Sequence, residues 1–457
     1  MNVTLTTNAD QFERAREQLA RTAAGPLAAR RETGWEQFRA TGLPTRRDEE
    51  WRFTSTAPIA KGDFALARSG EVPSEDLIRP FSFGGVSSAK LVFVNGHFCP
   101  QHSRRLTLPD KVLAGNLADA AVSHPQLVSE HLDRHPRSAD DPFTALNLAF
   151  LEDGAFIHVP AGLRVEGPIH LLYASTNGSE PLMCHPRNLV VLDEGSEVMV
   201  VEHYVSLHEG PAFSNVVTEA VVGPGARLNH YVLERENEQA INIETLAVRQ
   251  ERDSCLDSHT ALFGGRLVRN NIHVTLAGEG CDSLINGLYV GHGEQHLDNH
   301  MRVVHAAPNC HSRQLYKGIL DEQSHGIFSG RIVVEEGAQK TDAVQTNRNL
   351  LLSDSAKANA KPQLEIYADD VKCTHGATTG QLDPDALFYL RQRGIDETTA
   401  RGLLIYAFAS ENIQSMSVPS IRRQLLQALV QKLPHTAMFD ATGEEAQVVE
   451  EALGAAT

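Results

Sequence analysis

EGCDSLINGLYVGHGEQHLDNHMRVVHAAPNCHS, residues 279–312, decides the fold. Short runs in which Val, Ile and Leu alternate with polar residues lie between two similar turns, EGCDS and PNCHS. The same kind of turn recurs at intervals of 30, 29, 26, 29 and 28 residues, centred on Gly195, Gly225, Ser254, Gly280, Asn309 and Gly337. A period of this size indicates a stacked architecture in which each repeat buries its inward side chains on the next.

The repeats carry strand patterns and no helical pattern, which favours a β-solenoid. An antiparallel sandwich with similar turn spacing is the alternative that the pattern leaves open. Either way the chain is mainly β over residues 155–381, and the flanking regions differ from it in the spacing of their apolar residues.

Helical spacing of apolar residues dominates both ends of the chain. We therefore divide it into an N-terminal helical domain (1–82), a mixed hairpin and helix connector (83–154), the β core (155–381) and a C-terminal helical domain (382–457). Within the connector, Asn95-Gly96 predicts a hairpin turn between two alternating runs. Asp141 followed by Pro142 predicts the start of a helix.

Composition excludes several functions. The chain has 457 residues, with 41 Lys and Arg against 58 Asp and Glu, and its net charge is −17. Such a surface repels nucleic acid and anionic lipid. The longest apolar run, 403–409, is far too short to span a membrane. The N-terminus lacks the pattern of a signal peptide, so we expect a cytoplasmic protein.

The six cysteines are no closer than 26 residues to one another, which excludes CxxC pairs and predicts free thiols. The chain contains no GK dipeptide and hence no P-loop. If a nucleotide matters to this protein, a partner must bind it.

Histidines suggest two candidate sites. His292, His296 and His300 recur at four-residue steps, but in a strand such residues are too far apart to share one ion, so we expect them to have separate polar partners. Cys373 and His375 are two residues apart in a probable strand and therefore point to one side. Thiolate and imidazole can both ligate iron, yet two ligands do not complete a site. Spacing alone favours a buried thiol beside a hydrogen-bonded histidine.

Five blocks of the chain resemble the SufD family, the scaffold subunits of the SUF iron–sulfur cluster assembly system. The blocks are GLPTRRDEEWRFT (42–54), VFVNGHF (92–98), FTALNLAFLEDGAFIHVPAG (143–162), QHLDNHMRVVHAAPNCHSRQLYKGIL (295–320) and KCTHGATTGQLDPDALFYLRQRGI (372–395). The resemblance implies a right-handed parallel β-helix between helical domains. It also implies a non-catalytic subunit that works with SufB, its paralogue, and with SufC, an ABC-type ATPase.

The resemblance further implies where partners and cargo bind. SufB would pair with the C-terminal end of the β-helix, a surface that could form homodimers in isolation. SufC would bind the C-terminal helices, with Leu403, Leu404, Tyr406 and Phe408 as candidates, because residues 402–409 are apolar nearly all round. No cofactor would be held tightly by this chain alone.

A transient iron–sulfur cluster would form at the SufB interface, with His375 as a shared ligand and Cys373 as a weaker candidate. Two alternatives stay open: a SufB-like chain that carries the cluster itself, and a β-helix carbohydrate-active enzyme.

Overall fold

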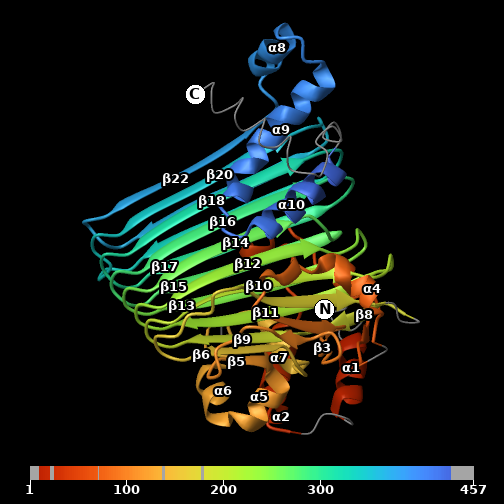
Figure 1. Ribbon diagram of the computed structural model, residues 1–457, viewed down its shortest axis with the longest axis vertical. Helices are drawn as coiled ribbons and strands as arrows, with labels where there is room; N and C mark the ends of the chain where they lie inside the picture. Colours follow the sequence, from red (N-terminus) through yellow and green to blue (C-terminus); the bar gives the residue numbers. More distant parts are fainter. Residues whose placement is uncertain (1–9, 21–24, 70–71, 136–138, 177–179, 434–457) are drawn as a thin grey trace.

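The computed structural model describes residues 10–20, 25–69, 72–135, 139–176 and 180–433. It is an elongated β-solenoid of about eight turns with helices at both ends (Figure 1). Two long sheets form its walls. Sheet A runs in the order β21-β19-β17-β15-β13-β11-β9-β6-β5, and sheet B in the order β22-β20-β18-β16-β14-β12-β10-β7-β2-β3.

The early strands are short and the later ones are nearly uniform in length. The first nine are β1 (Ala65–Leu66), β2 (Ala89–Val94), β3 (His97–Phe98), β4 (Arg104–Arg105), β5 (Leu113–Asn116), β6 (Ala155–Val159), β7 (Ile169–Ser175), β8 (Leu182–Cys184) and β9 (Arg187–Leu192). The solenoid continues with β10 (Glu197–Ser206), β11 (Ala212–Val222), β12 (Arg227–Arg235), β13 (Ile241–Gln250), β14 (Cys255–Leu262), β15 (Leu267–Leu276), β16 (Asp282–Gly291), β17 (His296–His305), β18 (His311–Leu320), β19 (His325–Val334), β20 (Asp342–Leu351), β21 (Lys357–Ile366) and β22 (Lys372–Gly380).

Every pairing between neighbouring strands from β9 to β22 is parallel. Successive strands alternate between the two sheets, so each turn of the chain stacks on the turn before it. This topology confirms the parallel β-helix and rules out the antiparallel sandwich.

The recurring turn is a backbone corner in which one residue adopts a left-handed conformation. This residue donates its N–H to a carbonyl of the next turn, as Gly195 does to Pro224 and Gly225 does to Arg252. At the third and sixth corners the left-handed residues are Asp253 and Lys340, which lie one residue before Ser254 and three residues after Gly337, the centres that the sequence spacing predicted. The corners thus hold the turns in register as well as reversing the chain.

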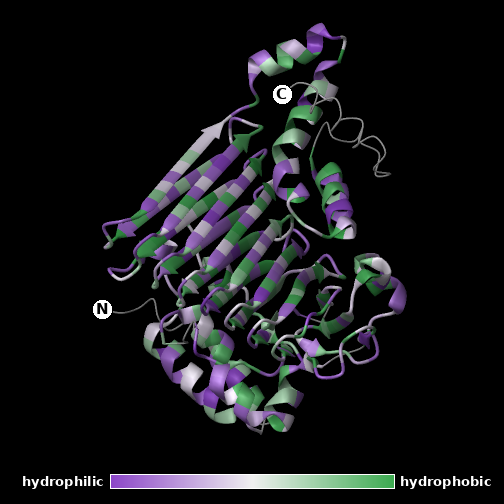
Figure 2. Cartoon of the chain, turned by 60° about the vertical axis from the view of Figure 1, so that its left-hand side comes forward, coloured by the Kyte–Doolittle hydropathy of each residue, from purple (hydrophilic) through white to green (hydrophobic). Residues whose placement is uncertain are grey.

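Hydrophobic and hydrophilic residues alternate along many of the strands (Figure 2). The apolar residues of one face form a core inside the solenoid, and part of the outer face of sheet B is apolar where α9 (Glu397–Gln414) and α10 (Pro419–Lys432) cover it. Fully burying a Val, Leu or Ile side chain contributes about 1.5–3 kcal/mol, and the lumen stacks such residues turn after turn. Buried polar groups interrupt the stack and bond to one another, for example Glu202 to His230 at 2.8 Å and Asn188 to Thr218 at 3.0 Å.

The N-terminal helices are α1 (Asp10–Ala20), α2 (Ala28–Thr41), α3 (Ala57–Lys61), α4 (Glu75–Ile78), α5 (Leu117–Ser123), α6 (Pro125–His131) and α7 (Pro142–Ala149), with short 3-10 turns at Glu49–Trp51, Arg79–Phe81 and Gly84–Val86. They cover the first turns of sheet A, except α4, whose Ile78 packs against β2, β7 and β10 of sheet B. Phe12, Trp35 and Phe150 pack with Phe213 of β11 in one apolar cluster.

Both local signals in the connector are confirmed. Asn95 and Gly96 turn β2 back onto β3 with positive φ angles, and the Asp141 side chain caps α7 through the Thr144 N–H at 2.8 Å.

Three helices follow the last strand: α8 (Pro384–Gln392), α9 (Glu397–Gln414) and α10 (Pro419–Lys432). α9 and α10 lie on the outer face of sheet B, whereas α8 projects beyond the last turn (Figure 1). The residues from 434 onward, which complete the predicted C-terminal domain, lie outside the described residues. None of the helices in the described part is long and apolar enough to cross a membrane.

Candidate functional site

The solenoid ends in two edge strands. Within the described part of the chain, β21 pairs only with β19 and β22 only with β20, so the outer sides of β21 and β22 are left without a neighbouring strand. We call these two unpaired sides the open edge. Nearly every residue of β22 is exposed. An edge of this kind presents free N–H and C=O groups that can pair with another chain.

Cys373 and His375 both lie on β22, where alternation points their side chains to the same face. Cys373 is half-buried against Ile332, Val334 and Ala343. Burial raises the pKa of its thiol above the ordinary value, so the thiol is protonated at neutral pH. A ligand thiolate would have to lose this proton when the metal binds.

His375 is exposed and lies opposite Gln345 of β20. No hydrogen bond or ion pair with another described residue holds its ring. The structure therefore separates the two residues: the thiol packs into the last turn, while the imidazole stays free to bind something outside the chain. Spacing alone favoured a hydrogen-bonded histidine, and that interpretation of His375 is wrong.

Across the described ranges, no three His, Cys, Asp or Glu side chains gather closely enough to hold a metal ion. Cys373 and His375 thus supply at most two ligands at the open edge. An iron–sulfur cluster bound there needs its remaining ligands from another molecule or from smaller groups.

The four α9 residues expected to bind a partner are placed differently from one another. Tyr406 is only 4% exposed, whereas Leu403, Leu404 and Phe408 are half-buried. The Phe408 ring lies 4.8 Å from the ammonium of Lys317 on β18, so part of it already packs against the solenoid. Much of the apolar character of α9 is therefore used within the chain.

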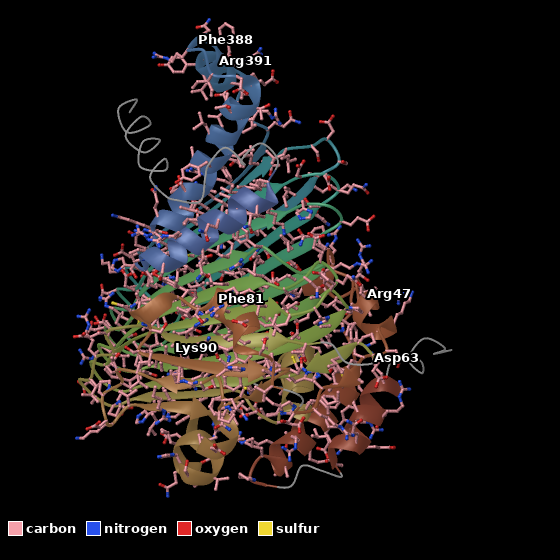
Figure 3. The ribbon with its side chains drawn as sticks, turned by 45° about the vertical axis from the view of Figure 1, so that its right-hand side comes forward. Arg47, Asp63, Phe81, Lys90, Phe388 and Arg391 are labelled. Atoms are coloured by element: carbon pink, nitrogen blue, oxygen red, sulfur yellow. The ribbon has the colours of Figure 1, made fainter. Side chains whose placement is uncertain are left out.

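The most exposed aromatic side chains of the C-terminal helices belong to α8. Phe388 is 62% and Tyr389 51% exposed. Figure 3 shows Phe388 at the tip of α8, away from both sheets. The sequence analysis placed the partner surface on α9 and did not include Phe388 and Tyr389. The adjacent residues FYL in this short helix indicate an apolar surface that α9 alone cannot cover.

The spaced histidines behave as expected, since each has its own polar partner. His292 contacts Glu238 at 2.7 Å, His296 contacts Thr54 at 2.9 Å, and His300 contacts Glu50. They do not converge on one point.

Comparison with known proteins covers almost the whole chain. Residues 173–408 match the family described as SUF system FeS cluster assembly, SufBD core domain, and residues 4–171 match the SufBD protein N-terminal region. The iron–sulfur cluster assembly protein SufD of Escherichia coli is 33% identical over 404 residues, which are 87% of this chain and 91% of that protein.

Two further relatives are similarly close. An iron–sulfur cluster assembly SufBD family protein of Synechocystis is 34% identical over 85% of this chain and 87% of its own length. The chloroplastic protein ABCI7 of Arabidopsis thaliana is 34% identical over 87% of this chain and 84% of its own length. With the β-helix, the flanking helices and these matches in agreement, the chain belongs to the SufBD family of iron–sulfur cluster assembly proteins and resembles its SufD members.

Proposed function

We propose that this chain is a non-catalytic, cytoplasmic scaffold subunit that helps a SufB-type paralogue and a SufC-type ATPase to build an iron–sulfur cluster. The observation that carries the proposal is the open edge at the C-terminal end of the solenoid, which bears Cys373 and an exposed His375 that has no partner among the described residues. A scaffold that shares a cluster needs an incomplete ligand set at a surface that a partner can complete.

The SufB-type partner docks on the open edge. Its own β-helix would continue the hydrogen-bonding ladders of β21 and β22, which end without a neighbour among the described strands. The same edge permits pairing between two copies of this chain when the partner is absent.

The SufC-type ATPase docks on the projecting C-terminal helices. The exposed aromatic side chains of α8 support this assignment, and the half-buried Leu403 and Leu404 of α9 extend the same apolar surface. Because α8 extends past the last turn, a protein bound to it would lie close to the open edge (Figure 1).

His375 is a shared cluster ligand and Cys373 a weaker one. An exposed imidazole reaches a cluster at the interface without rearrangement. Cys373 would have to leave its apolar contacts and lose a proton whose pKa burial has raised. This difference predicts that substitution of His375 reduces cluster content more than substitution of Cys373.

The test uses the complex co-expressed with SufB and SufC and purified without oxygen. His375→Ala and Cys373→Ser should both leave assembly intact, while cluster content, measured by absorbance and acid-labile sulfide, falls more for His375→Ala. Thr374→Ala is the matched control, because Thr374 lies between the two on β22 and points to the opposite face. Normal cluster content in both variants would show that neither residue is an essential ligand.

A further inference from the structure

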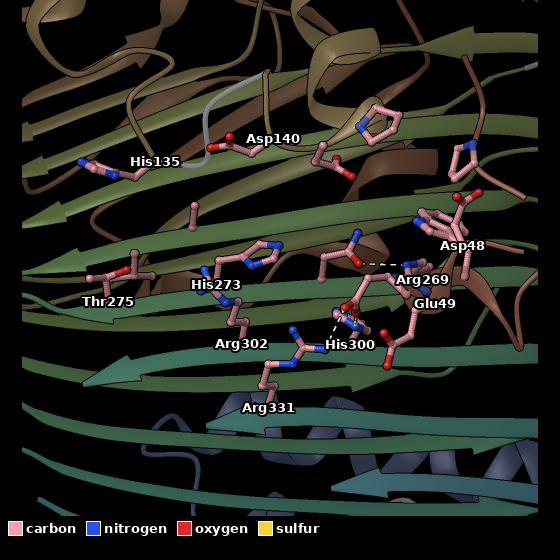
Figure 4. Close-up of a pocket in the computed structure, with 18 of the residues that line it drawn as sticks. Asp48, Glu49, His135, Asp140, Arg269, His273, Thr275, His300, Arg302 and Arg331 are labelled. Atoms are coloured by element: carbon pink, nitrogen blue, oxygen red, sulfur yellow. Dashed lines mark hydrogen bonds and ion pairs between the residues drawn. The ribbon is translucent and has the colours of Figure 1, made fainter. Parts of the chain in front are cut away.

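A cavity of about 840 Å³ lies between the outer face of sheet A and the N-terminal region. Its floor is formed by strands β13, β15, β17 and β19, and one wall by residues 48–51 (Figure 4). The proposed role of the open edge does not involve this cavity. Its size lies within the range of ligand pockets, which is about 300–1,000 Å³.

One end of the cavity shows how this surface binds a carboxylate. The two oxygens of Glu50 are held separately, one by His300 of β17 and the other by Arg331 of β19 at 3.0 Å. The bond from His300 lowers the pKa of Glu50 to about 2. A histidine and an arginine from neighbouring strands thus form a carboxylate clamp that the chain fills with its own side chain.

A second histidine–arginine pair lies one strand earlier and has no such occupant. His273 of β15 is directly opposite Arg302 of β17 in the parallel register, and both line the cavity (Figure 4). Neighbouring strands are about 4.8 Å apart, so the two side chains can reach one oxyanion together. Arg302 is exposed, and no hydrogen bond or ion pair joins either side chain to another residue in the part of the chain that the structure describes.

The missing partner of Arg302 is unusual on this sheet face. The other outward-facing arginines on the strands of sheet A each have an acid: Arg187 with Glu219 at 2.7 Å, Arg249 with Glu251 at 2.8 Å, Arg269 with Asp298 at 2.6 Å and Arg331 with Glu50 at 3.0 Å. The chain has 58 acidic residues against 41 basic ones, so acids are not scarce. Among the strand arginines of sheet A that the structure describes, Arg302 is the one that lines the cavity without an acidic partner; Arg134, which also lines the cavity, donates to the Glu130 carbonyl at 3.1 Å.

From this geometry we propose that the His273–Arg302 pair binds the oxyanion head group of a small organic ligand, a carboxylate or a phosphate ester, whose remainder occupies the cavity. Arg302 supplies a two-pronged charged donor, and the neutral ring of His273 supplies one further N–H. The cavity is much larger than a bare inorganic anion, which favours an organic acid over a free ion. Acidic groups at the rim, Asp48 and Asp140, disfavour a ligand with negative charge at both ends.

The full-length chain is titrated by calorimetry with glycerate, a monocarboxylate, and, separately, with glycerol 3-phosphate at matched ionic strength, so that the carboxylate and the phosphate source are compared. At least one probe should bind saturably with one equivalent per chain. Arg302→Gln should weaken that binding about tenfold or more, because a hydrogen bond to a charged group contributes about 1.5–3 kcal/mol. His273→Asn should weaken it by a smaller factor.

Arg227→Gln is the matched control. Arg227 is an exposed arginine on sheet B that makes no ion pair with the described residues and lines none of the cavity. It should bind the probes like the unmodified chain, and all variants should keep the same melting temperature. Absence of saturable binding for both probes, or equal binding by Arg302→Gln and the unmodified chain, would overturn the proposal.

Discussion

The Asn412 side chain holds the C-terminal helices against the solenoid by hydrogen bonds, and its substitution should allow these helices to detach. Its side-chain amide, only 2% exposed, donates to the carbonyls of Gly287 on β16 at 2.9 Å and Leu315 on β18 at 3.1 Å. Two strands of sheet B are thus tied to one position near the end of α9. Asn412→Leu keeps the branching of the side chain and removes both donors.

The expected cost follows from these two contacts. A hydrogen bond contributes about 1 kcal/mol net, and a buried acceptor left without its donor costs about 1–3 kcal/mol. Each carbonyl retains a second lone pair that other donors can use. We therefore expect the total loss of stability for both carbonyls to lie near the lower end of these values, at about 2–4 kcal/mol. If α9 opens as a local unit, this cost should raise the population of the open form about 30- to 700-fold.

Native-state hydrogen exchange measured by mass spectrometry reads this population peptide by peptide. Peptides of α9 and α10 should exchange faster in Asn412→Leu, peptides of β10 to β14 should not, and less SufC should co-purify. Ser410→Ala is the control on the same helix, because among the described residues the Ser410 hydroxyl bonds only to the Ala407 carbonyl within α9. Unchanged exchange in α9 would refute the view that Asn412 anchors the helices.

Two further predictions concern the surface of α8 and the Glu50 clamp. Phe388→Ser combined with Tyr389→Ser should reduce co-purification of SufC without lowering the melting temperature, since both rings are more than half exposed; unchanged co-purification would place the SufC surface elsewhere. Because the hydrogen bond from His300 lowers the folded-state pKa of Glu50 from 4.5 to about 2, its carboxylate stabilises the fold above pH 4.5 and loses that effect as the pH falls towards 2. In urea denaturation, Glu50→Gln should therefore be less stable at pH 7, by no more than about 1 kcal/mol at this half-exposed site, and should converge with the unmodified chain near pH 2.

The sequence predicted those parts of the fold that a few neighbouring residues determine. Asn95-Gly96 adopts the positive φ angles of a tight hairpin, and the Asp141 side chain bonds to an N–H three residues away. The solenoid was also predictable, because each turn must present the same inward pattern to the next. Such signals lie within one repeat or one turn of helix, so they are visible without knowing the rest of the molecule.

Other features depend on partners that are remote in the sequence. Whether Arg302 has a partner could not be judged before the structure placed Glu50 on Arg331, which lies 281 residues away. The burial of Ile405 likewise follows from the way α9 docks on sheet B, which its own apolar pattern does not specify. The third corner centres on Asp253 because its N–H meets the Glu279 carbonyl of the next turn.

The open edge allows a test that blocks docking while leaving the last turn folded. The Lys372 N–H donates to Thr341 of the preceding turn. In a parallel ladder alternate residues bond to the same neighbour, so the N–H groups of residues 374, 376 and 378 also face β20, and that of Ala377 faces the open edge. Proline is tolerated where an edge strand needs no donor. Ala377→Pro should therefore keep the β20–β22 pairing and remove a donor from the docking surface.

Ala377→Val is the matched control, because it adds bulk at the same exposed position and retains the N–H. We expect Ala377→Pro to lose co-purification with SufB, and to lose any homodimer seen by sedimentation, while Ala377→Val keeps both. Hydrogen exchange in β20 should stay unchanged in both variants, which shows that the last turn is intact. If Ala377→Pro still pairs with SufB as the valine variant does, the partner does not extend the ladder of β22, and the shared site at His375 must be approached from another direction.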